Sequence, residues 1–231
     1  MCIRDRVNTM PPIRSGLDER IKSVQQELKG YFQEAKHLYE EAINAFTKLD
    51  SEVYIEAKEA RAKAREVNWD LTNDLLLILA LNQPLMQDLR IIATYLRAVD
   101  TVERIIRHAR DIARSDRSID ENADHLPEEI VKPVLEMHGY LNDLMDITVV
   151  CLTEGKEVPA DEVRKTWKST KDAHAKAIAA LSTLQSDTMG GKASRLEVVN
   201  IVNRVDRSAY NIVRLNGMWH HALNNENIIL D

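Results

Sequence analysis

The sequence has few of the residues that make tight turns. Only 7 of its 231 residues are glycine and 6 are proline. All-β folds need a turn every ~8–12 residues and build many of those turns from Gly and Pro, so a sandwich or a barrel is not expected. The glycine-rich loops that hold nucleotide phosphates are missing too, because the one adjacent pair, Gly190-Gly191, lacks their spacing.

Cysteines and long apolar runs are also scarce. Cys2 and Cys151 are too few for a disulfide framework, and such usage is typical of a reducing compartment. The longest apolar run, Leu75–Leu81, is far shorter than the ~20 residues that span a bilayer. We therefore expect a cytoplasmic protein without membrane insertion. We also expect this run, with Leu77 and Leu79, to be buried on every side.

Positive charge is in deficit. Lys and Arg number 31 against 37 Asp and Glu, for a net charge of −6, and aromatic residues make up 5% of the chain. Nucleic-acid-binding domains are typically basic, so nucleic acid is not an expected partner. The 44% of hydrophobic and 29% of charged residues are instead typical of a folded globular chain.

What the sequence does contain is helical periodicity. From Leu17 to Leu49, apolar residues recur at alternating spacings of four and three, which predicts a packed helix. A second helix is expected to follow an N-cap at Ser51 and to end at Asn82-Gln83-Pro84, because proline disfavours the helical conformation in the residue before it. The predicted fold class is all-α, with two tandem three-helix bundles. The four further helices are predicted over residues 85–114, 127–153, 159–184 and 193–223.

The predicted helices divide the chain into four segments. Residues 1–15 are expected to be a disordered tail, in which Met1–Arg6 resembles a translated sequencing-adapter scar and Met10 is the expected natural start. Residues 16–115 form the first three-helix repeat, the polar residues 116–126 a linker, and residues 127–231 the second repeat.

An internal duplication supports two repeats. With an offset of 100 residues, the third predicted helix aligns with the sixth without a gap. Two helices with the same apolar seam can agree at apolar positions by chance, but the matched arginines are harder to explain that way. Asp111 corresponds to Asn211. The identical pairs are Ala93/Ala193, Leu96/Leu196, Val99/Val199, Val102/Val202, Arg104/Arg204, Arg107/Arg207, Ala109/Ala209 and Ile112/Ile212.

Motifs of the first half resemble those of the PhoU family. They are Gln83-Pro84, Asp88-Leu89-Arg90, Glu103-Arg104-Ile105 and Asp111-Ile112-Ala113. The second half has a weaker echo in Asn203-Arg204-Val205 and Asn211-Ile212-Val213. The resemblance implies tandem three-helix bundles and a cytoplasmic, non-enzymatic regulator of phosphate uptake and phosphate homeostasis. The partners it implies are the ATPase of a phosphate importer and a sensor kinase, with a homodimer as the assembly and no cofactor.

The metal positions of that family are replaced in this sequence. PhoU-like proteins carry carboxylate pairs at i and i+4, which share a helix face and chelate a cation. We therefore expect no bound metal. The alternative is a helical-bundle metal-binding protein that uses Asp70, Asp74 and Glu103. The matching pairs in this chain are Glu103/Arg107, Asn203/Arg207 and Asn68/Thr72.

Arginines at these positions supply a fixed positive charge. Each is expected either to pair with a carboxylate such as Glu103 or Asp206 or to hold an anion. Arg90, Arg97 and Arg104 recur every seven residues and share a helix face, which is either paired with acids of the first helix or a basic patch for an anion or an acidic partner. The residues predicted for family motifs and for anion or partner contact are Gln83, Pro84, Asp88, Arg90, Glu103, Arg104, Arg107, Arg204, Asp206 and Arg207.

No catalytic constellation stands out, so no enzymatic activity is predicted. Glu34 and His37 form one Glu-x-x-His, whereas a di-iron bundle needs two such motifs and two more glutamates. His108, beside Arg107, is expected to be a packing residue, and Cys151 a buried small hydrophobe.

Overall fold

The computed structural model describes residues 13–50, 52–120, 126–183 and 191–231. Within these ranges the chain forms α-helices and no strand, which confirms the predicted all-α class. The helices are α1 (Ile13–Lys48), α2 (Val53–Asn82), α3 (Gln87–Asp120), α4 (Glu128–Glu154), α5 (Ala160–Thr183) and α6 (Lys192–Asn224).

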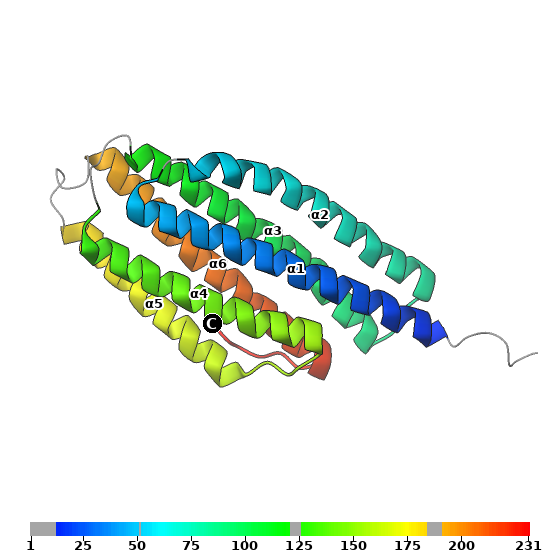
Figure 1. Cartoon of the computed structure of the whole chain (residues 1–231). Helices are drawn as coiled ribbons and strands as arrows, with labels where there is room; N and C mark the ends of the chain where they lie inside the picture. Colours follow the sequence, from blue (N-terminus) through cyan, green and yellow to red (C-terminus); the bar gives the residue numbers. More distant parts are fainter. Residues whose placement is uncertain (1–12, 51, 121–125, 184–190) are drawn as a thin grey trace, which may run out of the picture.

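The helices form two groups of three that are joined along their length. α1, α2 and α3 pack on one another, and so do α4, α5 and α6. The two groups meet where α3 packs on α6 and α1 packs on α4 (Figure 1). Buried apolar residues from both groups form one continuous core, because α3 and α6 each face their own group and each other. A domain division at residues 116–126 stays a prediction.

Polar bonds reinforce this junction inside the core. The Tyr95 hydroxyl of α3 donates to the Leu152 carbonyl of α4 at 2.9 Å, and the Tyr95 ring lies 5.8 Å from that of Trp219 on α6. Both rings are almost fully buried. A buried tyrosine hydroxyl needs such a partner, since an unpaired polar group in the core is costly. The bond therefore links α3 and α4 as well as satisfying the hydroxyl.

One predicted helix end is wrong. The helix expected to stop at Arg114 continues to Asp120. Asp116 and Ile119 are fully buried, so tertiary packing extends the helix through a segment whose polar composition indicated a linker. Of the other predictions, those on residues 1–12, Ser51, residues 121–125 and residues 184–190 lie outside the described residues.

The predicted break at Gln83-Pro84 is confirmed. α2 ends at Asn82 and α3 begins at Gln87. Gln83 and Met86 have φ angles of 45° and 48°, and these left-handed conformations reverse the chain between the two helices. Proline at position 84 lacks the N–H that another helical turn would use.

The prediction that Leu75–Leu81 is buried on every side is wrong. Leu75 and Ile78 are buried, but Leu77 is 51% exposed and Leu79 is only partly buried. The reason is the position of α2, which lies at an edge of the molecule and packs on α1 and α3 with one face (Figure 1). In the part of the chain that the structure describes, no helix is long and apolar enough to cross a membrane.

Candidate functional site

The two repeats meet where α3 and α6 run antiparallel. Near the start of α3, Gln87 Nε2 and Arg90 Nε donate to the carbonyls of Leu223 and Ala222, at 3.1 and 3.2 Å, at the end of α6. Near the end of α3, Ser115 Oγ donates to Glu197 Oε2 at 2.6 Å, close to the start of α6. Arg90, predicted as a contact residue, therefore contacts the second repeat.

Residues that the duplication makes equivalent lie opposite each other at the middle of this interface. His108 Nδ1 is 2.9 Å from Ser208 Oγ, and the two positions correspond in the alignment of the repeats. Ser208 Oγ donates to the Arg204 carbonyl at 2.9 Å, so it accepts from His108 and from Tyr39. Burial, helped by nearby arginines, lowers the pKa of His108 to about 3, which keeps the imidazole neutral. The prediction of His108 as a packing residue is confirmed.

On one side of this centre an ion pair joins the repeats. Arg204 Nη1 lies 2.7 Å from Asp111 Oδ2, and Arg110 Nη2 lies 2.8 Å from Asp111 Oδ1. The equivalent of Asp111 in the second repeat is Asn211. Arg104, the equivalent of Arg204, makes no ion pair with any residue that the structure describes.

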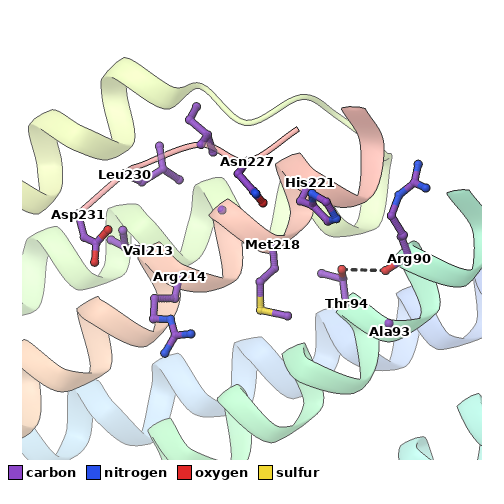
Figure 2. A pocket seen from close by; sticks show the side chains of 12 residues that line it. Arg90, Ala93, Thr94, Val213, Arg214, Met218, His221, Asn227, Leu230 and Asp231 are labelled. Atoms are coloured by element: carbon purple, nitrogen blue, oxygen red, sulfur yellow. Dashed lines mark hydrogen bonds between the residues drawn. The ribbon is translucent and has the colours of Figure 1, made fainter. Parts of the chain in front are cut away.

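On the side of Arg104 the interface opens into two adjoining pockets. One, of about 370 Å³, lies between the first turns of α3, the end of α6 and the C-terminal segment, residues 227–231. Figure 2 shows Arg90 and Thr94 of α3 on one side of it, with Met218 and His221 of α6 and Leu230 of the C-terminal segment around it. The other, of about 240 Å³, shares Arg214 and Met218 with the first. Its further lining residues are Arg97, Asp100, Thr101, Arg104, Asn211 and Leu215.

Two of the predicted carboxylates, Glu103 and Asp206, form ion pairs with basic residues other than Arg107 and Arg207. Glu103 Oε1 is 3.8 Å from Arg61 Nη2 on α2, and Asp206 Oδ1 is 3.0 Å from Lys171 Nζ on α5. Arg207 is exposed. Arg107 is half-buried, and its buried Nε has no hydrogen-bond partner among the residues that the structure describes. Glu103 and Asp206 thus bind neighbouring helices within their own repeats. Arg61 had no sequence signal, because only the packing of α2 on α3 brings it to Glu103.

The remaining predicted residues lie on α2 and its turn. Gln83, Pro84 and Asp88 line a pocket of about 410 Å³ with Leu17 of α1. Asp70 and Asp74 are exposed on α2. Among the described residues there is no group of three or more His, Cys, Asp or Glu side chains that could hold a metal ion.

Large apolar side chains are exposed along this same part of the molecule. We call them the α2–α3 apolar surface, which runs from the last turns of α2 across the turn into the start of α3. Native proteins rarely leave several large apolar side chains exposed in one place, so the exposed fractions of these side chains mark the surface as unusual. The residues are Leu76 (49%), Leu77 (51%), Leu81 (63%), Leu85 (75%), Met86 (82%) and Leu89 (46%).

Comparisons with known proteins agree with this architecture. Residues 28–115 match the family model of the PhoU domain. The crystal structure of the phosphate transport system regulatory protein PhoU from Streptococcus pneumoniae is similar, with a TM-score of 0.80 at 16% identity over 93% of this chain and 100% of that one. The crystal structure of PhoU from Pseudomonas aeruginosa has a TM-score of 0.80 at 17% identity, over 90% and 99% of the two chains. No curated protein matches the sequence. Residues 28–115 therefore match a PhoU domain, and nearly all of the chain's length has the fold of the PhoU proteins.

Proposed function

We propose that this chain is a non-enzymatic, cytoplasmic regulator of phosphate uptake and phosphate homeostasis that acts by contact with other proteins. Its PhoU domain and its likeness to a phosphate transport system regulatory protein support this function. The proposed main partner is the ATPase subunit of a phosphate importer. A sensor kinase is the second partner, and the protein acts as a homodimer.

The observation that carries the proposal is the α2–α3 apolar surface. Leu81 and Met86 are 63% and 82% exposed on either side of the Gln83-Pro84 turn. Exposed large apolar groups of this kind mark protein contact sites, because their burial on binding removes apolar area from water. The surface also lies beside the pocket lined by Gln83, Pro84 and Asp88, so the family motif and the exposed leucines occupy one region.

The environment of the buried histidines supports action without chemistry. His108 is buried, hydrogen-bonded to Ser208 and neutral, and burial also lowers the pKa of His138. A general base must reach its substrate and titrate near the working pH. Neither condition holds for His108, whose pKa is about 3. Cys151 is buried, and burial raises the pKa of its thiol to about 11, so it is a poor nucleophile.

The test is direct binding of purified protein to the phosphate-importer ATPase encoded in the same genome. The double variant Leu81→Glu/Met86→Glu places two charges in the proposed contact. We expect it to weaken binding by at least about tenfold, the effect of losing apolar hot-spot contacts. Leu196→Glu is the matched control, since Leu196 is 60% exposed on α6, outside this surface. Its affinity should equal that of the unmodified protein.

Two results would contradict the proposal. One is an unmodified protein that does not bind the ATPase. The other is a double variant that binds as tightly as the Leu196→Glu control. Light scattering on the same samples tests the homodimer separately. If the double variant alone becomes monomeric, the apolar surface serves self-association and the ATPase contact must lie elsewhere.

A further inference from the structure

The two ends of the α3–α6 interface differ in charge although the repeats make them equivalent. At one end, Arg204 pairs with Asp111, and Glu197 accepts a hydrogen bond from Ser115. The corresponding residues at the other end are Arg104, Asn211 and Arg97. Asn211 thus takes the place of the Asp111 carboxylate, and Arg97 takes the place of the Glu197 carboxylate. The acids that balance one end are missing from the other.

The consequence is a pocket with unbalanced arginines. Arg97, Arg104 and Arg214 line the pocket of about 240 Å³, and Asp100 is its one acidic residue. None of the three guanidinium groups forms an ion pair with a residue in the described ranges, although Arg214 lies over the Tyr210 ring with its Cζ 5.9 Å from the centroid. Three positive charges against one negative charge attract an anion.

We propose that this pocket binds an inorganic phosphate ion. Guanidinium groups are the side chains best suited to a phosphate, because their planar forks donate two parallel hydrogen bonds to its oxygens. The Asn211 amide can add a further donor, since its side chain has no other partner among the described residues.

Two acceptors in the pocket favour phosphate over other anions. Asp100 is a carboxylate, and Thr101 Oγ1 already donates to the Arg97 carbonyl at 2.8 Å, so both can only accept from a ligand. Near pH 7 the inorganic phosphate dianion still carries a proton that it can donate to them. Sulfate carries none, and a phosphate monoester, whose second pKa is about 6, has lost its own. The site is thus selective for free phosphate. The pocket carries this assignment whether or not the chain regulates phosphate transport.

The experiment is calorimetric titration of the full chain with inorganic phosphate, with sulfate and glycerol phosphate as parallel ligands. Asn211→Asp restores the carboxylate that Asp111 supplies at the other end, so it should pair with Arg104 and displace the ion without removing an arginine. We expect it and Arg104→Gln each to weaken phosphate binding by at least about tenfold, the usual effect of losing a charged hydrogen-bond partner. Asn203→Asp, the same charge change at an exposed α6 position, is the matched control and should leave the affinity unchanged. Asp100→Asn should remove the preference for phosphate over sulfate.

Each outcome decides the proposal. Saturable phosphate binding that is lost in Asn211→Asp and Arg104→Gln but kept in Asn203→Asp supports it. Absence of saturable binding to the unmodified protein overturns it, and so does binding that survives both pocket variants. Equal affinity for sulfate or glycerol phosphate overturns the assignment of inorganic phosphate. Circular dichroism of every variant confirms that a lost affinity is not a lost fold.

Discussion

His108 and Ser208, equivalent residues of the two repeats, contact each other at the interface between α3 and α6, with His108 Nδ1 2.9 Å from Ser208 Oγ. Tyr39 OH lies 3.1 Å from the same oxygen, and Ser208 itself donates to the Arg204 carbonyl. The serine hydroxyl therefore uses its one donor and accepts from two neighbours. When two copies of a duplicated sequence pack on each other, equivalent positions meet at the pseudo-twofold axis. In an exact duplication the two residues there would be identical, whereas here one is histidine and the other is serine.

The His108 network predicts acid sensitivity. The pKa of His108 falls from 6.5 to about 3 on folding, first because of burial and then because of Arg204, Arg107, Arg104 and Arg207. Between these values the unfolded state binds the proton and the folded state does not. The stabilisation is therefore complete above pH 6.5 and is lost as the pH falls toward 3. Urea unfolding at a series of pH values should show this decline.

The variant His108→Gln separates this contribution from others. Its amide can still donate to Ser208 but does not titrate, so the decline below pH 6.5 should become shallower. It should not vanish, because burial also lowers the pKa of His138. A pH profile identical to that of the unmodified protein would show that His108 is not the titrating group.

Leu75 and Leu77 predict opposite responses to truncation. Leu75 is fully buried, so Leu75→Ala should lower the free energy of unfolding by about 2–5 kcal/mol through lost burial and a cavity. Leu77 is 51% exposed, and Leu77→Ala should cost less than about 1 kcal/mol, as for most surface changes. Chemical denaturation of both variants measures the difference. Equal losses would mean that α2 is covered on its outer face as well.

Asp111 predicts a salt-sensitive contribution to stability. Its carboxylate accepts from Arg110 and Arg204 at 2.8 and 2.7 Å, and Arg204 is 37% exposed. Asp111→Asn should lower the free energy of unfolding by about 1 kcal/mol, a value discounted for solvent screening of the exposed partner. The loss should shrink in about 1 M salt, where charges are screened within about 3 Å. A loss that does not change with salt would point to packing as its cause.

Glu103 predicts the outcome of a metal analysis. Its carboxylate lies 3.8 Å from Arg61 Nη2 of α2, an arrangement suited to an ion pair and not to a bound cation. Elemental analysis of tag-free protein, purified without chelator, should find no stoichiometric iron, zinc or manganese. Metal that disappears in Glu103→Gln would refute this expectation. Metal that disappears only in Asp70→Asn/Asp74→Asn would locate a site on the exposed face of α2.

The sequence alone was enough to determine the helices, their order and the break at Gln83-Pro84. These features depend on local backbone geometry, since a helical period and a proline act within a few residues. The duplication could also be detected from the sequence alone, because aligning the chain with itself places Arg104 on Arg204. The tertiary structure decided what each helix faces. Leu77 and Leu75 belong to one apolar run, yet only the position of α2 at the edge leaves Leu77 in solvent. Likewise, Arg204 forms an ion pair with Asp111, whereas Arg104 lines a pocket together with Asn211. The antiparallel packing of α3 on α6 determines which residue lies near each arginine.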